Sequence, residues 1–304
     1  MPQLAAYLFT LLLVLGAIGQ GHAQEEYPSE ACAAANKLES IAQYDILTQA
    51  GARPRRLLIE GYFYDKAGRN TRWRQYEAHD STKYSDRDFN YDATGKHVKM
   101  AQISADGADG IIDSVGTDAN GIVTYRKLYR PSGEVLFEMW ITTELNDRKQ
   151  PIKTAAFNKQ KQLQGYTTFT YNTAAKPVAE LGFSMANELE QQTLYSYYPD
   201  GTLRKISSIK GTRDTIETKL FMPNGSLMEE RRYNQEMHGA LDHKIVKKYD
   251  SQQREVEEVT YSNNFFPGAK NKLVPSRREV SQYGTSCLKI KTLIYTIDTL
   301  SGKE

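Results

Sequence analysis

The sequence has little cysteine and little net charge, and it lacks long apolar runs after its first residues. Only 2 of its 304 residues are cysteine, too few for a disulfide-rich mini-protein or a Cys₄ zinc site. The 39 Lys and Arg nearly balance the 37 Asp and Glu, for a formal net charge of +2. Nucleic-acid-binding domains are usually strongly basic, so no nucleic acid partner is expected. The 11% aromatic content, with 20 Tyr, also excludes a disordered chain.

The one long apolar run, residues 4–19, predicts a signal peptide. Small residues follow it at Gly21 and Ala23, the −3 and −1 positions of a cleavage site. We therefore expect residues 1–23 to be removed on export, with the mature chain periplasmic or extracellular. A membrane anchor is the alternative, but the run is shorter than the about 20 residues that a transmembrane helix needs. No transmembrane span is expected after cleavage.

Turn signals recur along the rest of the chain in two forms. Tyr-Asp-x-x-Gly-basic occurs at residues 64–69 and 91–96, with decayed copies at 171–176 and 249–254. Pro-polar-Gly-x-aliphatic occurs at residues 131–135, 199–203 and 223–227. Such self-similarity at a nearly constant spacing is typical of a repeat architecture.

Each form has a physical basis. Asp at the first turn position accepts a hydrogen bond from the backbone two residues on, and Gly at the fourth suits a type I turn. In the second form, Pro presets φ for the second turn position, and the following Gly adopts a positive φ in a hairpin loop with a bulge. The predicted turn glycines are Gly68, Gly95, Gly133, Gly201 and Gly225.

The segments between the turns are rich in β-branched and aromatic residues, which favours strands. Strand, turn and strand recur without helical spacers. This predicts an all-β protein of serial antiparallel β-hairpins in a twisted, curved meander sheet. We place the repeat domain at residues 57–286 and a C-terminal strand and tail at 287–304. A change of apolar phase within the last strand indicates a bulge near Thr292 or burial of both faces.

Residues 24–56 interrupt the repeat pattern and are expected to form an N-terminal helix and a linker. The segment is Ala-rich, and Leu38, Ile41 and Ile46 follow at roughly helical spacing. Ser29 can serve as its N-cap. One short helix is therefore expected within about residues 29–45.

The second half of the chain resembles known repeat families. Residues 198–205, Tyr-Pro-Asp-Gly-Thr-Leu-Arg-Lys, resemble the Tyr-Tyr-x-x-Gly-x-Leu repeat of bacterial MORN-like proteins of the toxin–antitoxin accessory type. Residues 233–250 are similar to a longer cycle of that family, but Gln253 replaces its last Gly. The Tyr-Asp-x-x-Gly-Arg form resembles the YD repeats of Rhs-type surface proteins. Together these similarities cover residues 60–262, and they imply serial hairpins, a repeat without catalytic residues, and a binding or scaffold role.

Two clusters were weighed as metal sites. His238 and His243 lie close in sequence, but their spacing places the two rings on opposite faces of a strand. Residues 106–113 are rich in Asp and Gly, yet an EF-hand register leaves two of three ligand positions empty and puts Gly116 where the bidentate Glu belongs. Solvent-facing repeat residues and a hairpin loop are the competing interpretations. No metal and no cofactor are expected.

No nucleophile elbow, dinucleotide-binding fingerprint or phosphate-binding loop occurs in the sequence. The chain is therefore expected not to be an enzyme, although a hydrolase with paired carboxylates stays open. The leading hypothesis is a non-enzymatic exported scaffold that contacts a protein partner in the cell envelope. A glycan-binding module using Tyr and Trp faces is the alternative.

The two cysteines, Cys32 and Cys287, belong to no metal or nucleophile motif. In an exported chain, such a pair most simply forms a disulfide. That bond would tie together the two segments that flank the repeats. Two unrelated buried thiols are the alternative.

Overall fold

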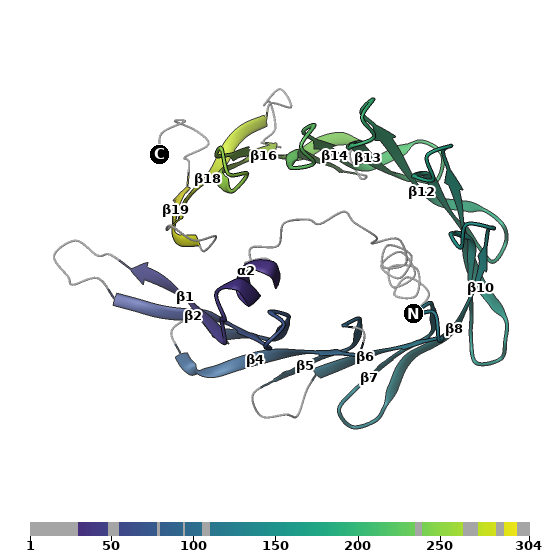
Figure 1. Ribbon diagram of the computed structural model, residues 1–304, viewed down its shortest axis with the longest axis horizontal. Helices are drawn as coiled ribbons and strands as arrows, with labels where there is room; N and C mark the ends of the chain where they lie inside the picture. The colour runs from purple at the N-terminus through teal and green to yellow at the C-terminus, as the bar shows by residue number, and fades with distance from the viewer. Residues whose placement is uncertain are drawn as a thin grey trace. The chain divides into compact units, whose positions relative to one another are not determined.

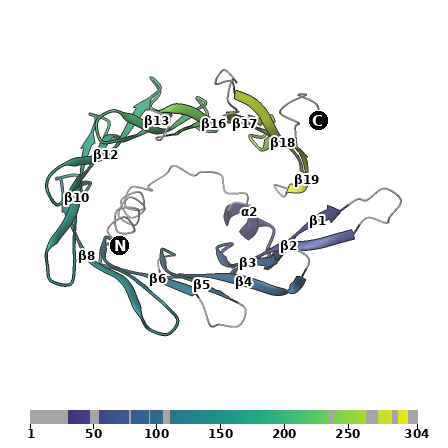
Figure 2. The same ribbon diagram turned by 180° about the vertical axis from the view of Figure 1, so that it is seen from behind.

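The computed structural model describes residues 30–47, 55–77, 80–93, 95–104, 110–234, 239–263, 273–283 and 289–296. Within these ranges the chain forms nineteen strands and one short helix, so the predicted all-β hairpin fold is confirmed (Figure 1). The strands pair antiparallel with their neighbours in sequence, and the two ribbon views show them following one another in chain order (Figure 2).

The chain divides into two compact units. One comprises residues 25–143 and 156–163, and the other contains residues 144–155 and 164–304. The first unit contains the helix and eight strands: α2 Glu30–Ala35, β1 Ser40–Leu47, β2 Arg55–Tyr64, β3 Asn70–Glu77, β4 Asp80–Tyr91, β5 His97–Ser104, β6 Gly110–Thr117, β7 Val123–Tyr129 and most of β8 Val135–Leu145. The second contains most of β9 Pro151–Phe157, and then β10 Leu163–Tyr171, β11 Pro177–Ser184, β12 Leu189–Tyr197, β13 Leu203–Lys210, β14 Asp214–Phe221, β15 Leu227–Asn234, β16 Ala240–Tyr249, β17 Glu255–Asn263, β18 Leu273–Tyr283 and β19 Lys289–Thr296.

One five-residue turn geometry recurs along both units. In the turn at 198–202, the Tyr198 N–H donates to the Thr202 carbonyl at 2.8 Å, and the Gly201 N–H donates to the Tyr198 carbonyl at 2.8 Å. The fourth residue of the turn has a positive φ, 85° at Gly201. The predicted turn glycines all occupy this position, with φ between 81° and 89°: Gly68, Gly95, Gly133, Gly201 and Gly225. The two sequence forms therefore encode a single turn.

Decayed copies of the motif keep this turn without glycine. The fourth position is held at φ values of 59° to 63° by Lys149, Lys161, Ala175, Asn187 and Gln253. Their turns begin with Asn, Ser or Asp, whose side-chain oxygen accepts backbone N–H groups further along the turn. This local hydrogen bonding supports a backbone conformation that ordinary side chains seldom adopt.

Alternate turns of a meander lie at the same edge of the sheet, so one edge of each unit carries a regular series. Its turns occupy residues 65–69, 92–96 and 118–122 in the first unit, and 146–150, 172–176, 198–202, 222–226 and 250–254 in the second. Within each unit they begin 24 to 28 residues apart. The nearly constant repeat length therefore corresponds to two strands and two turns.

The buried apolar core is small. In the first unit, α2 packs on the sheet through Ala33, which is fully buried, against Tyr62 and Tyr64. Partly buried hydrophobic residues join this cluster: Leu38, Ile41 and Trp73. Most other described strand residues are half-buried, so the sheet depends on contacts between side chains of adjacent strands.

The predicted short N-terminal helix is present as α2, but the strand that follows it was not expected. The helix ends at Ala35, and the strand β1 contains Ile41 and Ile46, whose spacing is roughly helical. Pairing with β2 places Ile41 opposite Tyr62, and the register then skips Ile59 of β2 between Gln43 and Tyr44. The cross-strand pairing with β2 therefore overrides the roughly helical spacing of the apolar residues. The strand β2 also begins earlier than the expected linker end.

At the other end, β19 is the predicted final strand. It pairs with β18, and the register passes from Gln282 opposite Lys291 to Tyr283 opposite Lys289. The extra residue is therefore Ile290, whereas the bulge was expected near Thr292. No helix in the described ranges has the length and apolar character that crossing a bilayer requires.

Candidate binding surface

The repeat tyrosines are joined to the backbone by their hydroxyl groups. Each closes a strand and donates to the carbonyl just after the preceding turn on the same edge. The pairs are Tyr91 with Asn70, Tyr171 with Pro151, Tyr197 with Pro177, Tyr249 with Leu227, and Tyr283 with Glu255, at 2.6 to 2.9 Å. These phenols are structural, so their hydroxyls are not free to recognise a ligand.

The basic residue that ends the turn reaches the next repeat. The ammonium groups of Lys96 and Lys176 donate to the carbonyls of Gly121 and Gly201, each in the next turn along the edge. The cations also lie over the next repeat tyrosine: Arg69 over Tyr91 at 5.0 Å, Lys176 over Tyr197 at 5.6 Å and Arg254 over Tyr283 at 4.8 Å. The Tyr, Asp, Gly and basic residues of the motif thus all form or stabilise the turns and the contacts between neighbouring hairpins.

Only one of the two candidate metal-binding histidines lies within the described residues. The His243 Nδ1 lies 2.8 Å from the carboxylate of its neighbour Asp242, while His238 falls outside the described residues. Across the described ranges, no group of three or more His, Cys, Asp or Glu is placed to hold a metal ion.

Only the last part of the Asp- and Gly-rich candidate calcium segment, residues 110–113, is described. Its last acidic residue, Asp113, is buried in β6 and forms a bidentate ion pair with Arg126 of β7, with an Arg126 Nε to Asp113 Oδ1 distance of 2.9 Å. The side chains of this pair are 12% and 8% exposed. The carboxylate is therefore committed to a cross-strand contact, and the preceding residues 105–109 lie outside the described part of the chain.

The second unit also contains buried ionisable groups. Glu180 in β11 accepts a hydrogen bond from the Tyr195 hydroxyl at 2.6 Å. Burial raises the pKa of the Glu180 carboxyl, although this hydrogen bond opposes the rise. Burial and the Glu180 charge raise the pKa values of Tyr171 and Tyr197 on neighbouring strands.

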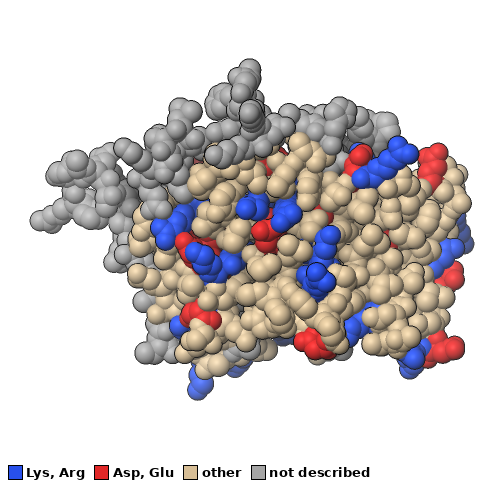
Figure 3. Space-filling model, turned by 90° about the horizontal axis from the view of Figure 1, so that it is seen from above, with Lys and Arg blue, Asp and Glu red and all other residues tan. Residues whose placement is uncertain are grey.

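Lys247 in β16 lies 2.9 Å from the carboxylates of both Glu255 and Glu258 in β17. Burial opposes its charge, but these two hydrogen bonds raise its pKa overall. Burial and then the Glu255 charge raise the pKa of Tyr249 to about 12. Opposite charges are also interspersed over the face shown in Figure 3. Lys247 is therefore paired with two carboxylates of the adjacent strand.

A partly exposed patch of aromatic and aliphatic side chains lies on β7 and β8. Its members, which we call the Trp–Tyr patch, are Tyr125, Tyr129, Val135 and Trp140. Tyr125 is opposite Trp140 in register and Tyr129 is opposite Val135. The Tyr125 and Trp140 ring centroids are 5.4 Å apart. Val135 is 47% exposed and Trp140 is 38% exposed. The Tyr125 hydroxyl donates to Glu138 at 2.5 Å, which fixes the ring.

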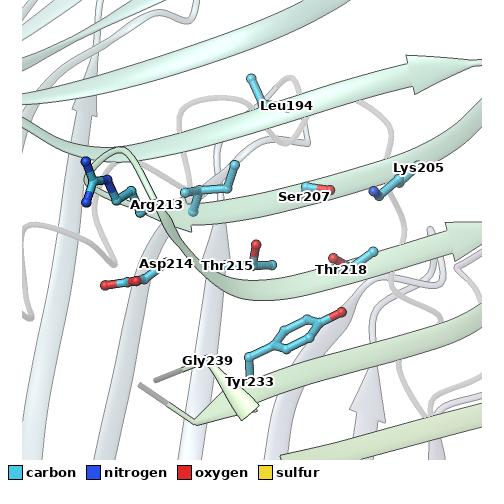
Figure 4. Close-up of a pocket in the computed structure, with 10 residues that line it drawn as sticks. Leu194, Lys205, Ser207, Arg213, Asp214, Thr215, Thr218, Tyr233 and Gly239 are labelled. Carbon is cyan, nitrogen blue, oxygen red and sulfur yellow. The ribbon is translucent and has the colours of Figure 1, made fainter. Parts of the chain in front are cut away.

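A shallow polar hollow of about 460 Å³ lies over β12 to β16 in the second unit (Figure 4). Register places Leu194, Ser207 and Thr218 side by side on three successive strands. The remaining lining residues are Lys205, Ile209, Arg213, Asp214, Thr215, Tyr233 and Gly239. Four of the ten lining residues carry a hydroxyl group, so the hollow offers hydrogen bonds more than apolar area.

Cys32 lies in α2, is 6% exposed and is disulfide-bonded. Cys287 lies outside the described residues, as does the expected signal peptide. The pairing of Cys32 with Cys287 therefore stays a prediction.

Sequence reasoning missed both the Trp–Tyr patch and the hollow. The segments between the turns were predicted to be strands, but the register that sets Tyr125 beside Trp140 cannot be read from one sequence. The hollow combines residues from β12 to β16, whose Ser and Thr residues follow no motif. The only available signal was period-2 alternation, which places Lys205, Ser207 and Ile209 on one face.

No protein-family model and no curated protein matches this chain. Among solved structures, the chain is similar to a porin-like protein from Bacteroides uniformis, with 10% identity over 78% of this chain and 94% of the other, at a TM-score of 0.36. It is also similar to the Photorhabdus luminescens Tc holotoxin pore, with 11% identity over 84% of this chain and 20% of that chain, at a TM-score of 0.19. A protein of unknown function from Bacteroides fragilis matches with 14% identity over 58% of this chain and 94% of the other, at a TM-score of 0.20. At these identities and scores, the similarities carry no argument about function.

Proposed function

We propose that the protein is an exported, non-catalytic binding protein that contacts a protein partner in the cell envelope through the Trp–Tyr patch. The exposure of Trp140 beside Tyr125 is the observation that carries this proposal. The polar side chains of the repeat motif already form contacts within and between hairpins. Recognition is therefore assigned to the side chains on the strand faces.

The composition of the patch favours a protein over a small polar ligand. Trp and Tyr are the residue types that most often dominate protein interfaces. Val135 adds exposed aliphatic surface next to the rings, which a protein partner can cover. The hydrogen bond from Tyr125 to Glu138 orders the ring before binding, which lowers the entropic cost of association.

The test is affinity capture from envelope extract with the mature chain, followed by binding of the purified captured protein. We expect Trp140→Ala to weaken the purified complex by about tenfold or more, as for a central interface aromatic. Met185→Ser is the matched control, because Met185 is 71% exposed in a turn outside the patch. If both variants bound as tightly as the unmodified chain, the patch would not be part of the interface.

A second candidate is glycan binding in the hollow over β12 to β16. Its support is the set of hydroxyl-bearing side chains on one sheet face, Ser207, Thr215, Thr218 and Tyr233. Hydroxyl groups both donate and accept, which suits the alternating donors and acceptors of a sugar. Binding of neutral and acidic oligosaccharides by the purified chain tests this candidate.

A further inference from the structure

We propose that the hollow binds a saccharide that carries a carboxylate, with Lys205 as the residue that recognises the charge. This inference rests on the second candidate function, glycan binding, and names the ligand class for that site. The volume of about 460 Å³ lies within the range of small-molecule sites, about 300–1,000 Å³.

Lys205 lines the hollow without an ion-pair partner among the described residues, unlike two cations on the next two strands. Lys219 pairs with Glu217, and Arg231 pairs with Glu229. Lys205 is exposed and has no ion pair in the described part of the chain. In the register of the sheet it faces Leu220 on β14, an apolar neighbour that cannot neutralise it. An anionic ligand would supply the missing partner.

The polar groups at this end of the hollow converge. Figure 4 shows Lys205, Thr218 and the Tyr233 hydroxyl at the same end, with Ser207 next to Lys205. The Tyr233 hydroxyl also interacts with Arg231. A carboxylate at Lys205 would therefore place the hydroxyls of its own sugar ring within reach of Ser207 and Thr218.

The acidic residues nearby do not cancel this attraction. Glu229, two strands from Lys205 in the same cross-strand row, lies 2.5 Å from the Arg231 Nε. Asp214 lies next to Arg213 at the opposite end of the hollow (Figure 4). That end is electrically balanced, so it suits neutral sugar hydroxyls. The asymmetry orients the ligand, with its carboxylate at Lys205.

The test is calorimetric titration of the mature chain with a galacturonic acid trimer and with its methyl ester, which keeps the hydroxyls and removes the charge. We expect the ester to bind about tenfold or more weakly than the acid, the loss of one charge-assisted hydrogen bond. Lys205→Gln should reduce acid binding to the affinity of the ester. Affinity for the acid should also fall as salt is raised.

Lys210→Gln is the matched control, since Lys210 is exposed on the same strand but alternates to the other face. Acid binding should be unchanged in this variant. Equal binding of acid and ester would overturn the charge proposal and leave glycan binding intact. Binding of neither ligand would overturn both. An equal loss in the Lys205 and Lys210 variants would show only a diffuse charge effect and reject the site.

Discussion

The Tyr197 hydroxyl donates to the backbone carbonyl of Pro177, 20 residues earlier in the chain, at 2.6 Å. Equivalent bonds recur along the sheet, so the motif tyrosine joins the end of one strand to the start of the preceding one. The tyrosine of the repeat motif thus supports the backbone. This explains how a sheet with little buried apolar core keeps its register.

Removing one of these hydroxyls should lower stability without altering the fold. Tyr197→Phe is expected to cost about 0.5–1.5 kcal/mol in the free energy of unfolding, the usual net value of one hydrogen bond. Tyr261→Phe is the control, because the Tyr261 ring lies 4.4 Å from the Lys244 ammonium and keeps that contact as Phe. Denaturant unfolding measures both. Equal effects would mean that the Pro177 hydrogen bond adds nothing.

The turn glycines should differ in their tolerance of alanine. Gly225 has φ +87° and open space at the Cβ position, so Gly225→Ala is expected to cost only its backbone strain, about 1 kcal/mol. At Gly201, φ is +85° and the new Cβ would also meet the Lys176 Nζ, so Gly201→Ala should cost more. Gly225→Asn should cost less than Gly225→Ala, because Asn tolerates the left-handed region. Identical losses for the two alanine variants would exclude a role for Lys176.

Breaking the buried pair of Asp113 and Arg126 should be the most damaging single change proposed here. Asp113→Asn leaves Arg126 buried without its counter-charge, which costs about 3–5 kcal/mol. Replacing both residues with Leu and Met should recover much of that loss, since it removes the uncompensated charge. Thermal or denaturant unfolding provides the measurement. If Asp113→Asn were as stable as the unmodified protein, the ion pair would have to be exposed to solvent.

The raised pKa of Glu180 predicts a pH dependence with a defined sign. Folding favours the protonated carboxyl, so the ionised carboxylate destabilises the folded protein. This destabilisation is absent below the ordinary pKa of 4.5 and grows as pH rises through the higher pKa of Glu180 in the folded protein. Glu180→Gln should therefore stabilise the protein at neutral pH, with the gain vanishing in acid. Gln also retains an acceptor for the Tyr195 hydroxyl.

Glu257 provides the opposite case. Hydrogen bonds from Lys248 and Arg278 lower its pKa, so its contribution is present above the ordinary pKa and is lost as pH falls through the folded value. Glu257→Gln should destabilise at neutral pH. Unfolding free energies over a pH series compare the two variants, and the same sign for both would contradict the assignment of their environments.

A disulfide between Cys32 and Cys287 is expected to contribute up to roughly 5 kcal/mol, because it closes a very long loop. Peptide mapping of the mature chain without reductant should recover the two cysteines in one linked fragment. Reduction should then lower the unfolding temperature. Two thiols that titrate freely in the folded, air-exposed protein would defeat the prediction.

The hairpins could be predicted because turn chemistry is local. Gly201 and Gly225 were identified from their own neighbours, and their positive φ values follow from the same short-range rules. The N-terminal strand was missed because pairing with β2 overrode the apparent helical spacing of Ile41 and Ile46. The Trp–Tyr patch and the hollow depend on register across strands, a property of the folded sheet that one sequence does not encode locally.

Within each unit, the pairing of described strands with their immediate successors has a kinetic consequence. Contacts between adjacent strands join residues close in sequence, so the contact order of the sheet is low for an all-β protein. Each hairpin can close with little loss of loop entropy, and folding can begin at several turns and propagate along the chain. Folding should therefore be faster than in β-sandwiches of similar length. Its slowest step should be the pairing of the first and last strands with the rest of the repeats.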